Sequence, residues 1–193
     1  RNPPTLRRDG SMMNLNALKI DPEFQGKIPP LTFEELNQLE ANILRDGRII
    51  NPIIVWQGLI VDGHNRYTIA KKHPEIPFTV HEKDFASRYE AIIWICKNQL
   101  GRRNLTPEQK KYLVGKQYEA EKALIPNEKG TNQYTSLVGG QNDHQPKNEK
   151  TRARIARETN TTDSFVRRAE GFAKGVDAAE EAVPGTRQKV LSG

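Results

Sequence analysis

The segment Asp62-Gly63-His64-Asn65-Arg66 carries residue types that bind phosphate groups. A short apolar run precedes it and a stretch with helical character follows, so Gly63 would stand where a strand meets the N-terminus of a helix. Such a helix end exposes unpaired N–H groups and a partial positive charge, and a glycine lets an anion approach the backbone closely. His64 and Asn65 can donate hydrogen bonds, and Arg66 can form a forked pair with phosphate oxygens. The pattern predicts a phosphate or nucleotide site at Gly63, His64, Asn65 and Arg66.

Two alternatives to a binding site remain open at this junction. In the plainer one, Asp62 and Gly63 form an ordinary turn and Arg66 pairs with Asp62. In the other, Asp62 is the catalytic carboxylate of a metal-dependent nuclease or NTP hydrolase. The four histidines and the single cysteine show no metal-ligand spacing, so no metal ligands are assigned. Cys96 lies in an apolar segment and is expected to be a buried, unreactive residue.

A second group of residues with binding chemistry lies near the C-terminus. Residues 151–160 and 162–182 are predicted helices with a short break between them, and the spacing of their apolar residues is typical of a helix-turn-helix. Asn160 tolerates the left-handed backbone that such a turn requires, and Thr162 or Asp163 can cap the second helix. The start of a recognition helix meets base edges and phosphates. The candidate DNA-binding residues are Arg152, Arg154, Thr162, Ser164, Arg167 and Arg168. The alternative is a plain helical hairpin with a solvated charged face.

The elements that must position these residues follow from capping signals and apolar spacing. Thr32 with Glu35, and Thr106 with Gln109, form capping boxes that open two helices, and Gly47 ends the first. The predicted helices are 32–47, 65–73, one that begins after Ser87, and 106–124. The predicted strands are 51–56, 58–61 and 77–81, with a tight hairpin at Gln57-Gly58.

Composition limits the class of protein. The 193 residues can form one large domain or two small ones, and the net charge of +6 permits a nucleic-acid partner. No apolar run approaches the roughly 20 residues that span a bilayer. One cysteine cannot form an internal disulfide, which fits a reducing compartment. We therefore expect a cytoplasmic protein with no membrane partner.

The predicted fold class is α+β. We expect a mixed-sheet domain followed by an all-helical part with a helix-turn-helix. The expected divisions are a disordered or expression-derived N-terminus at 1–14, a domain at 15–100, a connecting helix at 101–125, a flexible linker at 126–150 and a DNA-binding segment at 151–193. The chain is expected to be a fragment of a longer protein or to carry a short added N-terminal remnant.

Three segments in the first half carry a family resemblance. "LEANILRDGRIINPIIVW", "IVDGHNRYTIAKK" and "KNQLGRRNLTPEQ" resemble, in order and spacing, the three boxes of the N-terminal domain of the ParB/sulfiredoxin superfamily. The C-terminal helices resemble the helix-turn-helix that follows this domain in ParB-like proteins. The resemblance implies a small mixed-sheet ParB/sulfiredoxin-like domain and a DNA-binding function in plasmid or phage partition or transcriptional regulation.

The second box matches the family only in part. Gly63 matches the motif glycine and Arg66 its second arginine, whereas His64 stands where glutamate is usual and Asn65 where the first arginine is usual. Sulfiredoxins carry a reactive cysteine at the position of His64, so reductase activity is not expected.

The third box implies further site residues. Asn98 matches the family pattern, and Lys97 replaces the glutamate that helps to hold a nucleotide-bound metal. A lysine cannot ligate Mg²⁺, so the resemblance implies that Lys97 would neutralise a phosphate directly and that Mg²⁺ is not required. The candidate cofactor is a nucleoside triphosphate. The expected partners are double-stranded DNA and a second copy of the chain, in a bacterial cell and in association with the nucleoid or a plasmid.

Overall fold

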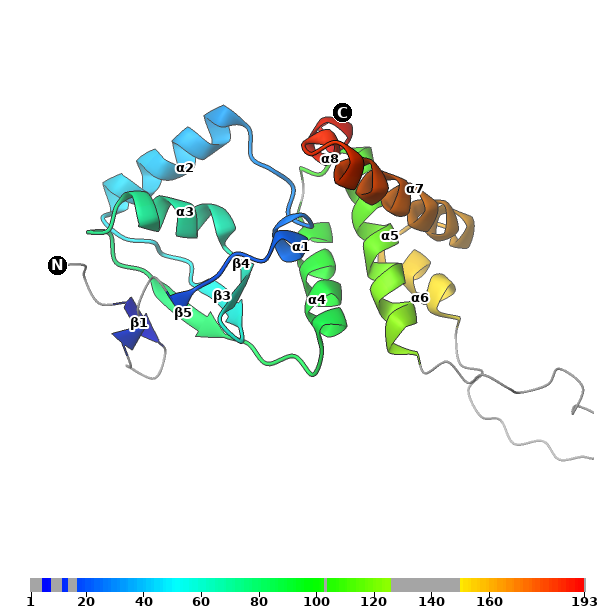
Figure 1. Ribbon diagram of the computed structural model, residues 1–193, viewed down its shortest axis with the longest axis horizontal. Coiled ribbons are helices and arrows are strands. Elements are labelled where there is room, and N and C mark those ends of the chain that lie inside the picture. The colour runs from blue at the N-terminus through cyan, green and yellow to red at the C-terminus, as the bar shows by residue number, and fades with distance from the viewer. Residues whose placement is uncertain (1–4, 8–11, 14–16, 103, 126–149, 193) are drawn as a thin grey trace, which may run out of the picture.

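The structure is a computed structural model that describes residues 5–7, 12–13, 17–102, 104–125 and 150–192. It shows a mixed sheet covered by helices, followed by a group of packed helices (Figure 1). The predicted α+β class is confirmed. The predicted linker at 126–150 lies, apart from Lys150, outside the described residues. None of the described helices is long and apolar enough to cross a membrane.

The sheet has five short strands in the order β2-β1-β5-β3-β4. Their bounds are β1 Thr5–Arg7, β2 Met12–Met13, β3 Ile53–Trp56, β4 Leu59–Asp62 and β5 Thr79–Glu82. Strands β3 and β4 are antiparallel, and both β1 and β3 run parallel to β5. The predicted hairpin is confirmed, because Gln57 and Gly58 have φ angles of 50° and 78°, as a tight turn with two left-handed residues requires.

Strands β1 and β2 lie within residues 1–14, which the sequence analysis described as a disordered or expression-derived N-terminus. Strand β1 pairs with β5, and β2 pairs with β1. The edge of a sheet offers unpaired N–H and C=O groups to any extended segment, whatever its side chains. Main-chain pairing of this kind depends little on side chains, so a sequence pattern does not indicate it.

Neighbouring residues of the sheet point to opposite faces and build two hydrophobic cores. In β4, Ile60 packs with residues of α2 (Phe33–Asp46) and α3 (His64–Lys72), whereas Val61 packs with α1 (Pro22–Gln25) and α4 (Arg88–Leu100). Cys96 of α4 is fully buried in the second core, and burial raises the pKa of its thiol to about 12. It is therefore the unreactive apolar residue that the sequence predicted.

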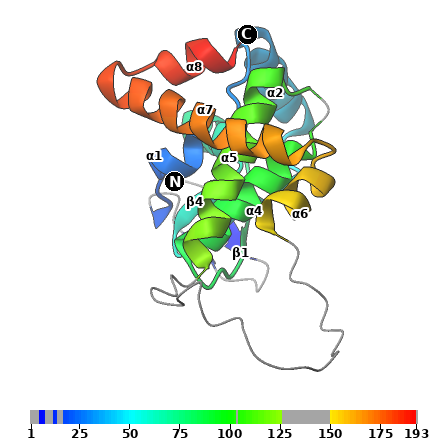
Figure 2. The same cartoon turned by 90° about the vertical axis from the view of Figure 1, so that its right-hand side faces the viewer.

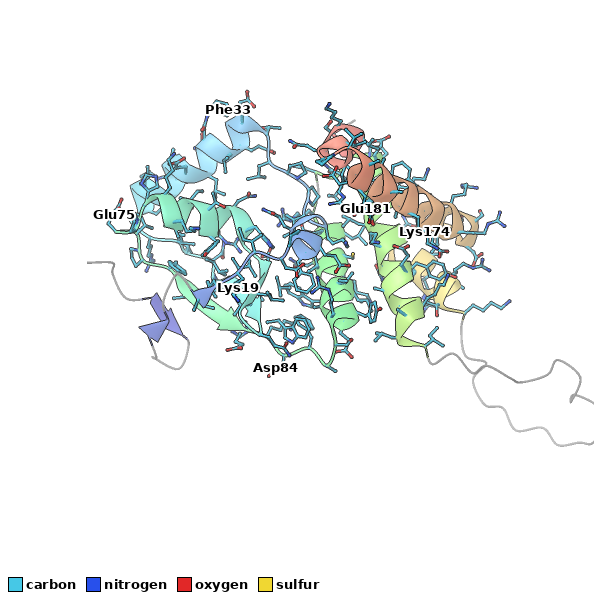
Figure 3. The ribbon with its side chains drawn as sticks, viewed as in Figure 1. Lys19, Phe33, Glu75, Asp84, Lys174 and Glu181 are labelled. Carbon is cyan, nitrogen blue, oxygen red and sulfur yellow. The ribbon has the colours of Figure 1, made fainter. Side chains whose placement is uncertain are left out.

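Helix α2 has the predicted boundaries. The Thr32–Glu35 capping box opens it, and Gly47, at a φ of 64°, ends it. Leu36 and Leu39 pack against the first core. Phe33, which shares their helical spacing, is instead 75 % exposed at the outer end of the helix (Figure 3).

Helix α5 (Pro107–Leu124), within the segment described as a connecting helix, is the centre of the helical part. Its first turn has the predicted capping box of Thr106 and Gln109. Successive residues of a helix point about 100° apart, so Tyr112, Leu113 and Val114 face three different hydrophobic clusters. Leu113 packs with α4, Val114 with α6 (Thr151–Glu158) and α7 (Asp163–Ala182), and Tyr112 with α7 and α8 (Thr186–Leu191). The two halves of the molecule therefore share this helix.

Helix α7 crosses α5 (Figure 2), and the two helices approach each other closely at Gly115. A methyl group on Gly115 would lie 2.2 Å from the carbonyl oxygen of Ala169 and 2.9 Å from the Cβ of Ala173. Only a glycine permits this distance between the helices, so Gly115 fixes where α7 lies against the rest of the molecule.

Candidate functional site

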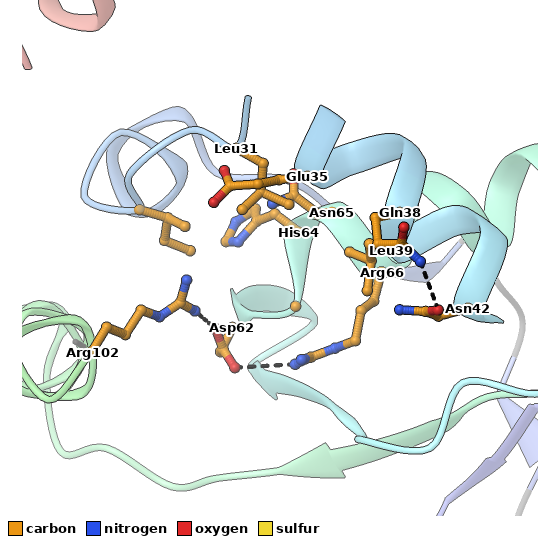
Figure 4. Close-up of a pocket in the computed structure, with 12 residues that line it drawn as sticks. Leu31, Glu35, Gln38, Leu39, Asn42, Asp62, His64, Asn65, Arg66 and Arg102 are labelled. Carbon is orange, nitrogen blue, oxygen red and sulfur yellow. Dashed lines mark hydrogen bonds and ion pairs between the residues drawn. The ribbon is translucent and has the colours of Figure 1, made fainter. Parts of the chain in front are cut away.

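A cavity of about 410 Å³ opens at the N-terminus of α3, between that helix and α2 (Figure 4). Gly63 is the N-cap residue of α3, with a φ of 96°, and no side chain caps the helix. The N–H groups of a first helical turn have no partners within the helix. The strand–glycine–helix junction predicted from the sequence is therefore confirmed, and its N–H groups are available to a ligand.

Gly63 is required by both its backbone and its surroundings. A left-handed φ strains any residue that carries a Cβ. A Cβ at this position would also lie 3.0 Å from Nη2 of Arg66 and 3.3 Å from the Cα of Ile53. A side chain here would displace the Arg66 guanidinium from its position beside the cavity.

Asp62 lies between two arginines, which approach it from opposite sides (Figure 4). Its Oδ2 is 3.1 Å from Nη2 of Arg66, and its Oδ1 is 3.7 Å from Nη2 of Arg102. Arg66 also donates a hydrogen bond to the carbonyl oxygen of Pro52, at 3.1 Å. The Arg66–Asp62 pair is the one expected if the junction were an ordinary turn, so Arg66 would have to turn from Asp62 toward a bound phosphate.

Helix α2 supplies the polar wall opposite α3. Glu35 lines the cavity while it accepts the capping hydrogen bond from the N–H of Thr32. Gln38 donates a hydrogen bond to Asn42, at 3.0 Å. The carboxylates of Glu35 and Asp62 balance the two guanidiniums, so attraction for an anion depends on the N–H groups of α3 and on release of the arginines from Asp62.

His64 is the most unusual residue of the cavity. Its side chain is 3 % exposed, and neither ring nitrogen has a hydrogen-bond partner among the described residues. Burial lowers its pKa to about 4, against a weaker opposing effect of Asp62. At neutral pH the imidazole is therefore uncharged and offers one donor and one acceptor. Because buried polar groups are nearly always hydrogen-bonded, His64 indicates a ligand or an ordered water in this cavity. Asn65, half-buried, lines the same space.

Lys97 and Asn98 do not line this cavity. Both are exposed on α4. Lys97 Nζ lies 3.0 Å from a carboxylate oxygen of Glu158 on α6. Partial burial raises the pKa of Glu158, but its hydrogen bonds with Lys97 and Arg154 outweigh this and hold the pKa below its ordinary value.

Arg102 lines the cavity, and the sequence analysis did not single it out. It lies four residues after Asn98, beyond the end of α4, and no local pattern marked it as a site residue. The structure thus brings Arg102 to the junction with Gly63, His64, Asn65 and Arg66, and it places Lys97 and Asn98 elsewhere.

The two C-terminal segments that the sequence predicted to be helical form α6 and α7. Asn160, in the break between α6 and α7, has a φ of 51°. The Thr162 hydroxyl caps α7 by accepting a hydrogen bond from the N–H of Phe165, at 3.1 Å. Ser164, Arg167 and Arg168 are exposed near the start of α7. Within the described part of the chain, Arg167 and Arg168 form no hydrogen bond or ion pair.

The arginines of α6 differ from each other in their partners. Arg152 Nε lies 3.2 Å from Oδ1 of Asp163, beside the start of α7. Arg154 pairs with Glu158, at 2.8 Å, and with the buried Glu121 of α5. Arg152 therefore remains at the surface that carries Ser164, whereas Arg154 ties α6 to α5.

No group of three or more His, Cys, Asp or Glu side chains among the described residues is placed to hold a metal ion. At the junction, Asp62 is the carboxylate that the enzymatic alternative requires. Both of its oxygens face guanidinium groups, which compete with a metal for the same lone pairs.

Comparison of the chain with models of protein families, with curated proteins and with solved structures finds no significant match. Any statement of function therefore depends on the residues and their geometry.

Proposed function

We propose that the protein binds double-stranded DNA through α6, the turn after it and the start of α7. The observation that carries the proposal is the exposed first part of α7, where Arg167 and Arg168 have no hydrogen-bond or ion-pair partner among the described residues. Ser164, also exposed there, shares a hydrogen bond with the Thr162 hydroxyl, at 3.2 Å. A recognition helix needs side chains that are free to meet base edges, and arginine forms bidentate hydrogen bonds with guanine.

Packed helices support this surface. Asn160 makes the turn, Thr162 caps α7, and Gly115 lets α7 lie directly on α5. A binding surface held by packed helices places its side chains more accurately than one on loops. Arg152, at the same end, would contact the DNA backbone, whereas Arg154 would position α6 through Glu121 rather than touch DNA.

The N-terminal half would supply a phosphate or nucleotide site at Gly63, His64, Asn65 and Arg66, with Arg102 as a fifth member. Together with the motif order in the sequence, this supports a ParB-like protein that acts in partition or transcriptional regulation in a bacterial cell. A metal-dependent hydrolase at the same junction is the weaker proposal, because Asp62 is already neutralised by Arg66 and Arg102.

The test is selection of bound sequences from a randomised duplex library, followed by titration of the selected duplex at several salt concentrations. Replacement of Arg167 or Arg168 by Ala should weaken binding roughly tenfold or more, because one bidentate base contact contributes about 1–3 kcal/mol. Arg152→Ala should instead lower the slope of log K against log salt by about 0.9, the effect of one lost phosphate contact.

Arg48→Ala is the matched control, because it removes one positive charge from an exposed loop of the other half. It should leave both affinity and selected sequence unchanged. Failure of the wild-type protein to enrich any sequence, or equal loss in Arg48→Ala and Arg167→Ala, would refute specific binding through α7.

A further inference from the structure

A cavity of about 400 Å³ lies between α4, α5 and α6, three helices that Figure 2 shows together. The last turn of α4 contributes Lys97 to its lining, α5 contributes Lys110 and Gln117, and the end of α6 contributes Glu158. None of these residues lines the cavity at the N-terminus of α3. The three helices therefore enclose a separate space that is large enough for a small ligand.

Gln117 indicates that this cavity holds a ligand. Its side chain is fully buried. Its Nε2 donates hydrogen bonds to carboxylate oxygens of Glu121, at 3.0 Å, and Glu158, at 3.4 Å. Because a carboxylate only accepts hydrogen bonds, the amide cannot be turned round, and its Oε1 is left without a partner among the described residues. Buried polar groups are nearly always hydrogen-bonded, so the cavity suits a ligand that donates a hydrogen bond to this oxygen.

Lys110 lies on the same face of α5 as Gln117, because seven residues make about two helical turns. It is partly buried, and its ammonium group forms no hydrogen bond or ion pair within the part of the chain that the structure describes. The other cation of the cavity, Lys97, pairs with Glu158, at 3.0 Å. One positive charge is therefore left without a counter-charge, and it suits an anionic group on the ligand.

The surroundings of Gln117 favour a positively charged donor. Helices α4 and α6 both end at the cavity, α4 at Leu100 and α6 at Glu158. A helix C-terminus carries a partial negative charge. The carboxylate of Glu158 adds to this charge beside the Gln117 amide. An ammonium group therefore suits Oε1 of Gln117 better than a neutral N–H group.

We propose that this cavity binds a small zwitterion of the amino-acid class, with its carboxylate at Lys110 and its ammonium group at Oε1 of Gln117. The two residues lie about 10 Å apart along the axis of α5. The flexible stem of Lys110 covers part of this distance, and the ligand spans the rest. The inference goes beyond the proposed DNA binding and does not depend on it, because none of the proposed DNA contacts lines this cavity.

The experiment is titration calorimetry of the full chain at neutral pH with each common amino acid and with γ-aminobutyrate. The preferred compound is then compared with its N-acetyl derivative, which lacks the ammonium group, and with its methyl ester, which lacks the carboxylate. Each derivative should bind about tenfold more weakly, because it loses one charged hydrogen bond. If acetate binds as tightly as the preferred amino acid, the cavity holds only an anion and the zwitterion is refuted.

Variants place the ligand in this cavity. Lys110→Ala should weaken binding of the amino acid about tenfold and should leave the affinity for its methyl ester unchanged, since the ester has no carboxylate to meet Lys110. Lys111→Ala is the matched control and should change neither affinity. It removes a cation from the next position of α5, which lies over the ring of Phe172 and does not line the cavity.

Gln117→Met removes the buried acceptor and should weaken the amino acid about as much as N-acetylation does. If this variant does not fold, the N-acetyl derivative tests the same contact in the wild-type protein. Equal losses in Lys110→Ala and Lys111→Ala would place the ligand elsewhere. If no amino acid binds the wild-type protein, the proposal is overturned, and Oε1 of Gln117 is bonded to water alone.

Discussion

Gly115 offers a direct test of how the DNA-binding helices are held. We consider Gly115→Ala, which adds one methyl group where α7 crosses α5. The methyl carbon would lie 2.2 Å from the carbonyl oxygen and 2.6 Å from the carbonyl carbon of Ala169. Both are backbone atoms, so the overlap can be relieved only by moving one helix away from the other.

Two opposing effects set the magnitude. Alanine in place of a helical glycine stabilises by about 1 kcal/mol when the new methyl group meets nothing. Overpacking of a close helix contact costs about 1–3 kcal/mol, and a backbone clash belongs at the upper end of that range. We therefore expect a net loss of about 2 kcal/mol in the free energy of unfolding for Gly115→Ala. For a chain of this length, this corresponds to a decrease of roughly 4–8 °C in Tm.

The matched control is Gly171→Ala on α7, because a Cβ at Gly171 would have no neighbour within 4 Å. It should gain about 1 kcal/mol, the full propensity difference. Urea and thermal denaturation followed by circular dichroism measure both variants. If Gly115→Ala stabilises the protein as much as Gly171→Ala does, then α5 and α7 do not approach as closely as described and the reasoning is refuted.

Three further perturbations test the candidate site and its support. Arg102→Ala should weaken the binding of tripolyphosphate or a nucleotide about tenfold in calorimetry, because it removes one charged hydrogen bond. Lys97→Ala should not change this affinity. Equal losses in the two variants would show that Lys97 belongs to the site. The free energy of unfolding, measured with urea, should decrease by about 2 kcal/mol when the pH is lowered from 7.5 to 5.0. The reason is that His64 takes up a proton near its ordinary pKa of 6.5 in the unfolded chain, whereas its pKa in the folded protein is about 4. His64→Gln should lose this dependence, and its persistence would contradict the burial of the imidazole. Thr106→Ala should cost about 1 kcal/mol in the same assay, because it removes the cap of α5, and an unchanged midpoint would contradict that role.

The start of each long helix was predictable from a few neighbouring residues. Thr32, Thr106 and Thr162 all act as N-caps, as their types and positions indicated. A cap satisfies N–H groups only two or three residues away, so its signal is complete within a short segment. The same holds for the tight turn at Gln57 and Gly58, whose backbone angles depend on local sterics.

The site was only partly predictable for a related reason. Gly63 and Arg66 lie within one turn of each other, so the junction could be identified from the chain alone. The roles of Lys97 and Arg102 depend on the direction in which α4 and the residues after it point, and this direction is set by packing against the sheet and α5. A motif aligned by order along the chain therefore included Lys97 and overlooked Arg102.

The sequence by itself determined the α+β class, the helix starts, the hairpin and the position of Gly63 at the N-terminus of a helix, because each depends on contacts within a few residues. Tertiary structure alone decided that His64 is buried without a partner, that Arg154 binds Glu121, and that α5 is shared by both halves. Those facts depend on which distant segments exclude water from one another, and exclusion of water depends on packing in three dimensions rather than on order along the chain.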